Sequence, residues 1–186
     1  MQRKDGSTSS DVEHVATIRE VAMSVQMFGT RTIEQNKIAI SCEQIITIGF
    51  HIDFTEITDI DNERVQKMFH GGIQKMLDQV AKPLLDLRPS SMEMAYMLTQ
   101  MSWQEKKMQG KVVEIGERVC DEMANHLHTY YLQNEQRSNY AARLVRLMNV
   151  VNAVNKIHME KREVLELARI FDVFKVDFSE PDIFDC

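Results

Sequence analysis

The sequence predicts an all-α domain, and three observations support this prediction. Apolar residues recur at spacings of three and four along most of the 186 residues, which is the period of a helix with one buried face. The chain has only 7 Gly and 3 Pro, with none between Gly116 and Pro181, so little interrupts helix in its second half. With 44% apolar residues, a single domain of this length can bury about 70% of its surface without disulfides or metal.

The N-terminal end is predicted to be a tail followed by a helix. Residues 1–11 are polar and expected to be disordered, and the folded domain spans 12–186. The sequence Ser9-Ser10-Asp11 supplies side chains that cap a helix start. The first helix therefore begins near residue 12, and Phe28-Gly29 ends it.

The next stretch, residues 33–54, is rich in isoleucine and allows two interpretations. Isoleucine favours strands because it is branched at Cβ, but these isoleucines also supply one helical face. We predict a helix from about 34 to 48, then a polar connection over 53–62.

The third helix starts at Val65, where apolar residues resume at helical spacing. We expect Gly71-Gly72 to loosen it and Pro83 to end it, because proline lacks the N–H that a helix interior needs.

A capping box marks the fourth helix. Ser90 can cap the first turn while Glu93, three residues on, reaches back to exposed N–H groups. This helix continues to Trp103, and a fifth follows from Gln109 to about Gln133.

The last helix is predicted to be the longest, from about 139 to 174. Apolar residues form a seam along it at alternating steps of four and three. Such a seam can run through the centre of the fold or pair with another subunit, and the pattern alone does not decide. The seam comprises Tyr140, Leu144, Leu147, Val151 and Val154.

Charge and cysteine content exclude several classes of protein. The net charge of −6 repels phosphate, so we expect no direct DNA binding. Cys42, Cys120 and Cys186 are scattered and fit neither a disulfide framework nor a zinc module, which favours cytosol or nucleus. No apolar run is long enough for a bilayer span, and residues 1–10 lack the apolar stretch of a signal peptide.

The sequence contains no recognised catalytic or metal-binding motif. Cys120, Glu122, His126 and His128 come nearest, and Glu122 with His126 could share one ion. His128 lies about 200° around the helix from His126, so surface histidines beside a buried thiol are the simpler interpretation. We therefore predict no enzyme, no cofactor and no metal.

The 13 methionines have two interpretations. Each can be ordinary core, or together they can line an adaptable apolar pocket, because thioethers repack around different guests. Those on the predicted stripes are Met68, Met76, Met92, Met94, Met97 and Met101.

Three segments in a fixed order carry a family resemblance. The first is MLDQVAKPLLDL at 76–87, followed by RPSSME at 88–93 and AYML at 95–98. The second is VAMSVQMF at 21–28, followed by NKIAI at 36–40, and the third is the long helix over 139–174 with the residues after it. Their order resembles the ligand-binding domain of nuclear hormone receptors, particularly the divergent receptors of nematodes, over residues 12–186.

The resemblance implies a fold and a buried ion pair. The fold is a layered antiparallel helical sandwich, and whether it is truncated at its N-terminal end stays open. Glu93 resembles a buried glutamate that pairs with an arginine of the long penultimate helix, for which Arg143 and Arg146 are the candidates. The family's DNA-binding module needs two zinc sites built from eight cysteines, which three cannot supply.

The resemblance also implies binding surfaces. The seam of the long helix is the expected dimer interface, and a small apolar ligand would lie between helices. Met23 stands where the family's coactivator-binding lysine would fall, so whether coactivator docking survives stays open. By analogy the ligand-lining candidates are Ile18, Ala22, Ile45, Ile48, Met68, Phe69, Ile73 and Leu165.

We therefore expect the ligand-binding and dimerisation domain of a nuclear, or cytoplasmic and nuclear, transcription regulator. Its expected partners are an apolar small molecule, a homo- or heterodimer partner and transcriptional coregulators, without direct DNA or membrane contact. The alternative is a ligand-independent helical protein that dimerises with or titrates a full receptor. A third hypothesis is a metal-dependent helical enzyme, in which Glu122 and His126 would hold the metal.

Overall fold

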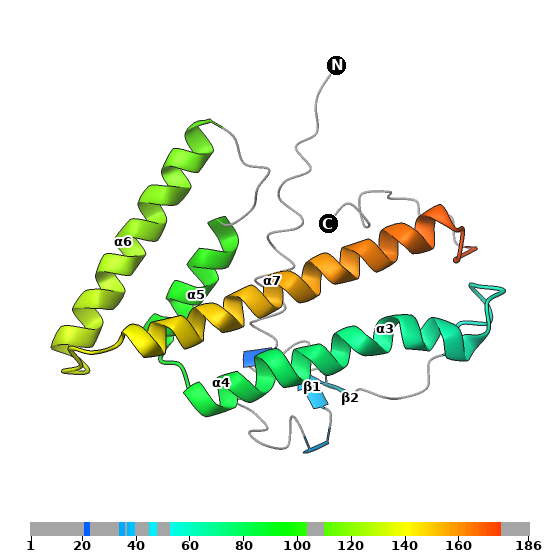
Figure 1. Cartoon of the computed structure of the whole chain (residues 1–186), viewed down its shortest axis with the longest axis horizontal. Helices are drawn as coiled ribbons and strands as arrows, with labels where there is room; N and C mark the ends of the chain where they lie inside the picture. Colours follow the sequence, from blue (N-terminus) through cyan, green and yellow to red (C-terminus); the bar gives the residue numbers. More distant parts are fainter. Residues whose placement is uncertain are drawn as a thin grey trace.

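The computed structural model describes residues 21–22, 34–35, 37–39, 45–47, 53–103 and 110–175 (Figure 1). This part of the chain is all-α apart from one small hairpin, with five α-helices and one π-helical segment. The elements are β1 (Lys37–Ala39), β2 (Ile45–Thr47), α3 (Asn62–Met76), η1 (Leu77–Ala81), α4 (Lys82–Leu87), α5 (Ser91–Trp103), α6 (Lys111–Gln133) and α7 (Ala141–Ile170).

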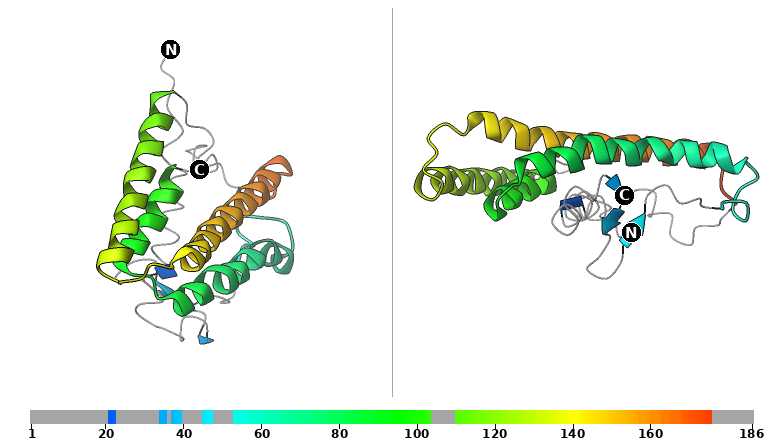
Figure 2. Two further views of the ribbon diagram at one scale, coloured as in Figure 1. Left: turned by 60° about the vertical axis from the view of Figure 1, so that its left-hand side comes forward. Right: turned by 90° about the horizontal axis from the view of Figure 1, so that it is seen from below.

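The helices form two antiparallel pairs. The rod made by α3, η1 and α4 runs beside α7, while α5 packs on α6 near the beginning of α7 (Figure 1). Seen from below, β1 and β2 lie on one side of this helical layer (Figure 2).

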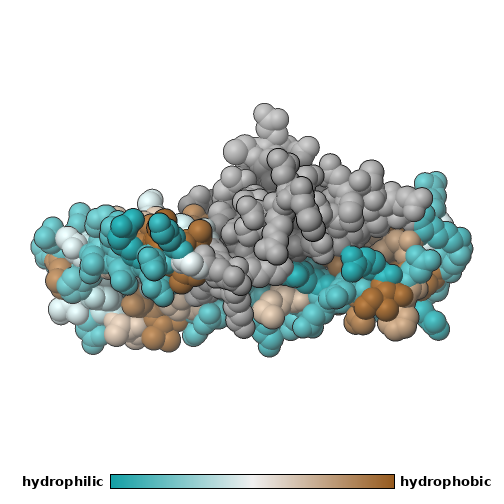
Figure 3. All heavy atoms as spheres, turned by 90° about the horizontal axis from the view of Figure 1, so that it is seen from above, coloured by the Kyte–Doolittle hydropathy of each residue, from teal (hydrophilic) through white to brown (hydrophobic). Residues whose placement is uncertain are grey.

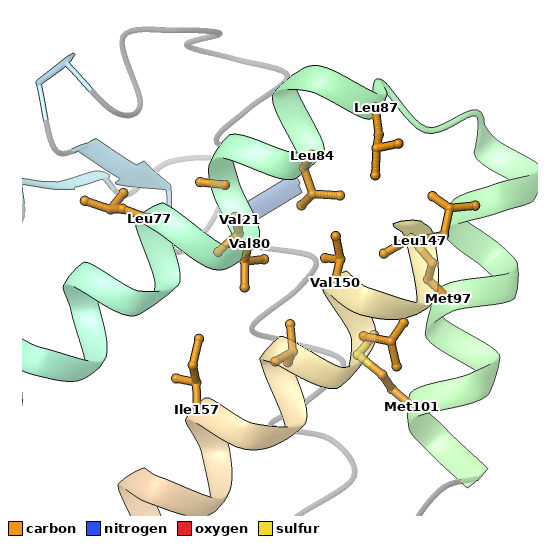
Figure 4. Close-up of a cluster of buried hydrophobic side chains, with 13 residues drawn as sticks. Val21, Leu77, Val80, Leu84, Leu87, Met97, Met101, Leu147, Val150 and Ile157 are labelled. Carbon is orange, nitrogen blue, oxygen red and sulfur yellow. The ribbon is translucent and has the colours of Figure 1, made fainter. Parts of the chain in front are cut away.

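The core lies where η1, α4, α5 and α7 meet (Figure 4). The side chains there are apolar and almost inaccessible, so their contacts fix how the two helix pairs sit together. The cluster consists of Val21, Leu77, Val80, Ala81, Leu84, Leu87, Met97, Met101, Leu147, Val150, Val151, Val154 and Ile157.

The helix predicted over 34–48 is wrong, because a hairpin occupies part of it. Strands β1 and β2 pair antiparallel, with Ile38 opposite Ile46. These β-branched residues thus form strands, which they favour, rather than the helix that their spacing also allows. Of the helix predicted over 12–28, Val21 and Ala22 are helical and the remainder lies outside the described residues.

The third predicted helix was expected to end near Pro83, and that expectation is wrong. The rod runs through Gly71-Gly72 and past Pro83 to Leu87. Residues 77–81 widen into a π-helix, in which the Lys82 N–H donates to the Leu77 carbonyl five residues earlier. The wider turn makes room for the proline ring, which then occupies the first turn of α4 where no N–H is required.

The remaining helices follow the predictions except at one end. Helices α5 and α6 match the ranges expected from sequence, but α7 stops at Ile170 rather than near 174. The Val173 N–H donates to the Ala168 carbonyl, and Asp172 adopts a positive φ of 50°. This is the hydrogen-bond pattern that ends a helix by a left-handed residue.

Two bonds then tie the end of α7 to the loop before α3. The Thr58 hydroxyl donates to the Val173 carbonyl at 2.5 Å, and the Lys175 N–H donates to the Ile57 carbonyl at 2.7 Å. The side chain of Lys175 also pairs with Asp59. We call these contacts the α7 clasp.

Two helical glycines should respond oppositely to alanine. A Cβ at Gly71 meets nothing within 4 Å, so Gly71→Ala should stabilise the fold by about 0.5–1 kcal/mol. A Cβ at Gly116 would lie 2.4 Å from the Trp103 ring, so Gly116→Ala should destabilise it by about 1–3 kcal/mol. Urea unfolding of the two variants measures the difference, and equal stability for both would contradict the packing of α5 on α6.

Candidate ligand-binding and partner-binding site

The capping box predicted at the start of α5 is present. The Glu93 carboxylate accepts the Ser90 N–H at 2.7 Å, and the Glu93 N–H donates to the Ser90 hydroxyl at 3.3 Å. An ordinary capping glutamate is exposed, but the Glu93 side chain is only 2% accessible. A buried carboxylate needs further partners, since an unpaired charge is costly in the interior.

Arg143, from the first turn of α7, supplies the charge partner. Its Nε donates to Glu93 Oε1 at 2.5 Å and its Nη2 to Oε2 at 2.9 Å, a two-point contact. The same Nη2 donates to the Leu87 carbonyl at the end of α4 at 2.9 Å. The structure thus pairs Glu93 with Arg143, while Arg146, the other candidate, is exposed.

Tyr131 of α6 completes this group. Its hydroxyl donates to Glu93 Oε1 at 2.5 Å, and its ring stacks on Tyr140 with centroids 4.5 Å apart. Three helices therefore meet at one carboxylate, and Arg143 connects α4 to it as the fourth. We call Glu93, Arg143 and Tyr131, with the Leu87 carbonyl, the Glu93 hub.

The hub holds Glu93 ionised. Burial alone would raise the pKa of Glu93, but the hydrogen bonds from Arg143, Tyr131 and Ser90 outweigh it and lower the pKa to about 2. Burial and the bond to Glu93 raise the pKa of Tyr131, so its hydroxyl stays a donor. The hub is a structural ion pair without a proton to exchange near neutral pH.

The predicted seam of α7 lies inside the chain's own fold. Leu147, Val151 and Val154 are 0%, 0% and 2% exposed within the core cluster. Tyr140 and Leu144 pack against the second apolar cluster, which is centred on Tyr96, Leu127 and Tyr131. Of the two alternatives for this seam, the structure therefore favours the centre of the fold, and a partner reaching α7 would meet other residues.

The exposed face of α7 carries those other residues. Val145, Met159, Leu167 and Ile170 are 59%, 57%, 50% and 65% exposed and share one side of the helix at helical spacing. Apolar atoms are also visible at the surface of both ends of the described part (Figure 3). We call Val145, Met159, Leu167 and Ile170 the outer stripe of α7.

The structure brings together only some of the ligand-lining candidates. Ile18 and Ile48 lie outside the described residues, as does Met23, and of Ile45, Phe69 and Ile73 only the backbone is described, in β2 and α3. Ala22 packs against the core cluster. Met68 and Leu165 are half-buried on facing helices.

An ion pair sets the register of Met68 and Leu165. Lys75 of α3 contacts Glu160 of α7 at 2.6 Å, and the two helices run antiparallel. Met68 precedes Lys75 by seven residues and Leu165 follows Glu160 by five. Because the helices are antiparallel, both therefore lie toward the start of α3 and the end of α7. Met68 and Leu165 therefore lie between this ion pair and the α7 clasp.

One surface groove lies between the rod and α7, with a volume of about 520 Å³. Its floor includes the buried side chains of Leu87 and Val150, and its rim is polar. The lining residues are Gln79, Pro83, Asp86, Leu87, Arg146, Asn149, Val150 and Ala153.

The candidate metal residues do not gather. Among the residues the structure describes, no group of three or more His, Cys, Asp or Glu could hold an ion. Glu122 and His126 are exposed, and His128 shares a hydrogen bond with the Tyr140 hydroxyl at 2.6 Å. Burial and the nearby Asp121 raise the pKa of the Cys120 thiol, which keeps it protonated. No described helix has the length and apolarity of a membrane span.

Comparison with known proteins defines the class of protein first. The family model of the ligand-binding domain of nuclear hormone receptor matches residues 14–171. The chain therefore belongs to the nuclear hormone receptor family, through its ligand-binding domain, and these receptors are not enzymes. No solved structure matches the chain significantly.

The similar curated proteins are nematode receptors. Nuclear hormone receptor family member nhr-213 of Caenorhabditis elegans is 60% identical over 166 residues, which is 88% of this chain and 40% of that protein. Family member nhr-54 of the same organism is 28% identical over 177 residues, 90% of this chain and 42% of that protein. The chain thus spans about two fifths of the length of these relatives.

Sequence reasoning missed two parts of the site. Tyr131 is one, because nothing in the local sequence indicates its contact with Glu93, 38 residues away. The groove also has no sequence signal, since its walls come from two helices that are distant in the chain. Helix α6 forms as its spacing predicts, but the apolar Val112 and Ile115 in its first turns are exposed.

Replacing one residue of the Glu93 hub should lower the free energy of unfolding. Arg143→Ala leaves the Glu93 carboxylate buried with too few partners, and should cost about 3–5 kcal/mol of unfolding free energy. Arg146→Ala is the matched control one turn later on an exposed position, and should change it by less than about 0.5 kcal/mol. Urea unfolding of dilute protein measures both, and similar losses would show that the hub does not hold the helices together.

The low pKa of Glu93 predicts that the free energy of unfolding falls in acid. Because folding lowers the pKa of Glu93 from 4.5 to about 2, its contribution is complete above pH 4.5 and is lost as pH falls toward 2. The loss should be on the order of 3 kcal/mol. Unfolding free energy measured across pH 2–7 should fall less steeply for Glu93→Gln than for wild type, and parallel curves would exclude Glu93 as the titrating group.

Proposed function

We propose that this chain is the ligand-binding domain of a receptor-type transcription regulator that responds to a small apolar molecule. The observation that carries the proposal is the match of the receptor ligand-binding domain over residues 14–171. The all-α architecture with an apolar interior between packed helices is consistent with it.

The proposed ligand lies between α3 and α7. Met68 of α3 and Leu165 of α7 are both half-buried on facing helices, and methionine adapts to guests of different shape. Ala22, Phe69 and Ile73 would complete the lining, with Ile18, Ile45 and Ile48 contributed by the preceding residues. A ligand held there adds contacts only when the two helices are closed on it, and so shifts the population toward the closed arrangement.

The regulator would act in the nucleus through association with protein partners. The similar nematode proteins are nuclear hormone receptors, which supports this role. Support for a partner contact comes from the outer stripe of α7, because four large apolar side chains of one helix face are half or more exposed. Coregulators and a second receptor are the partners expected of such a domain.

A ligand-independent interaction protein is the second candidate. It is favoured by the filled core, where Met97, Leu147 and Val151 are all 0% exposed and leave no room at that end of the helical layer. In that case the domain would dimerise with or titrate a full receptor without any small molecule.

Thermal unfolding with a panel of lipid-like compounds tests the proposal. A ligand at about a hundred times its dissociation constant should add about 2.7 kcal/mol of stability. Met68→Trp should fill the space between α3 and α7 and abolish the response, while Met159→Trp, at a 57% exposed position, should keep it. No response from any compound would favour the ligand-independent candidate, and equal responses from both variants would exclude the space beside Met68.

A further inference from the structure

Two adjacent glycines lie in the middle of α3. A Cβ at Gly71 or Gly72 would meet no atom of the described residues within 4 Å, so no close neighbour requires a glycine at either position. Glycine weakens a helix relative to alanine, because it loses more backbone freedom on folding. Packing therefore does not account for this weak point, whereas a need to bend would, since sharp bends in helices occur at such residues.

The two glycines separate a firmly held part of the rod from a loosely held part. After them, Leu77, Val80 and Leu84 belong to the core cluster. Before them, Val65 is the only buried side chain among those that the structure describes in α3, and it belongs to neither apolar cluster. A segment with few buried apolar contacts opens more readily than a core segment. Residues 62–70 are therefore the part of the rod that moves most easily.

Two polar connections hold α3 to α7, one on each side of the glycines. The Lys75–Glu160 ion pair lies after them. The α7 clasp lies before them, where the loop that precedes α3 meets the residues that follow α7 (Figure 1). Met68 is three residues before Gly71, between the clasp and the glycines. Once the clasp opens, residues 62–70 can therefore turn about the glycines while Lys75 keeps its contact with α7.

We propose that Gly71 and Gly72 are a hinge on which residues 62–70 swing away from α7 as one helical piece. Hinges are a few residues, often small, that absorb a change in backbone angles. The swing exposes Val65 and carries Met68 away from α7, which opens apolar space between the two helices. A small apolar molecule can then enter from solvent. This use as an entry route rests on the proposed function, whereas the swing itself does not.

Thiol labelling with N-ethylmaleimide tests the hinge. Val65→Cys places a thiol on the swinging piece, and Val80→Cys is the matched control beyond the glycines, since both valines are 0% exposed. The control should label only as fast as its free energy of unfolding allows, and Val65→Cys at least about tenfold faster than its own allows. Adding Gly71→Ala and Gly72→Ala together should remove most of this excess, because alanine stiffens the helix at the hinge. Peptide mass spectrometry reads each introduced thiol separately from the three native cysteines.

Hydrogen exchange on the chain without any substitution separates a swing from local unfolding. In a swing, the N–H groups of residues 66–70 keep their helical bonds, because donors and acceptors lie on the same piece. The N–H groups of residues 72–75 bond across the glycines, and after correction for intrinsic rates they should exchange at least about tenfold faster. Equally fast exchange over 66–75 would mean that the segment unfolds, and would overturn the hinge. This measurement stands even if Val65→Cys fails to fold.

Two labelling results would also overturn the inference. These are a thiol at position 65 that labels no faster than unfolding allows, and an excess that survives both alanines, as fraying of the first turn of α3 would give. The response to lipid-like compounds is read separately, by thermal unfolding. A stabilising response without the labelling excess rejects the hinge alone and leaves the proposed function standing. A labelling excess without any response rejects the ligand and leaves the hinge standing.

Discussion

The buried carboxylate of Glu93 is the constraint on which the arrangement of helices depends. A charge that is 2% accessible persists only if the fold brings it enough donors, and here they come from Ser90, Tyr131 and Arg143. Ser90 belongs to the same capping box, Tyr131 to α6 and Arg143 to α7, and Arg143 also binds the last carbonyl of α4. Because one arginine serves both Glu93 and Leu87, α4, α5 and α7 cannot shift independently. The adjoining core of Leu84, Met97 and Leu147 fills the space that this junction encloses.

The rod of α3, η1 and α4 shows how a proline is accommodated opposite that junction. Pro83 cannot donate to the carbonyl four residues before it, so an unbroken α-helix would leave a strained turn. In the π-helical turn at residues 77–81 the hydrogen bond spans five residues rather than four. This lets the helix continue to Leu87. As a result Leu77 and Val80, within the π-helical turn, and Leu84, after it, all reach the core. The same irregularity places Gln79, Pro83 and Asp86 along one wall of the groove.

Sequence predicted the features that depend on local spacing. The capping box of Ser90 and Glu93, the all-α class and the ranges of α5 and α6 follow from periodicity and cap chemistry. The hairpin was missed because the isoleucines of residues 37–47 satisfy both periods, and pairing between strands decides such a case. The seam of α7 was recognised, but spacing cannot tell an internal neighbour from a second chain. Contacts between distant helices, such as Tyr131 with Glu93 or the walls of the groove, have no signature in one sequence.

The two ends of the helical layer differ in how firmly they are held, and this difference bears on ligand binding. At the beginning of α7, the hub and a core of nearly inaccessible side chains leave no freedom for a guest. Toward its end, α3 and α7 are joined by the Lys75–Glu160 pair, whose side chains are 46% and 34% exposed, and by the α7 clasp. An exposed ion pair contributes less than about 1 kcal/mol, so separating the helices there costs far less than at the hub. Met68 and Leu165 lie between this exposed ion pair and the clasp. The α3–α7 end is therefore held less firmly than the beginning of α7, where the hub keeps α4, α5 and α6 in place.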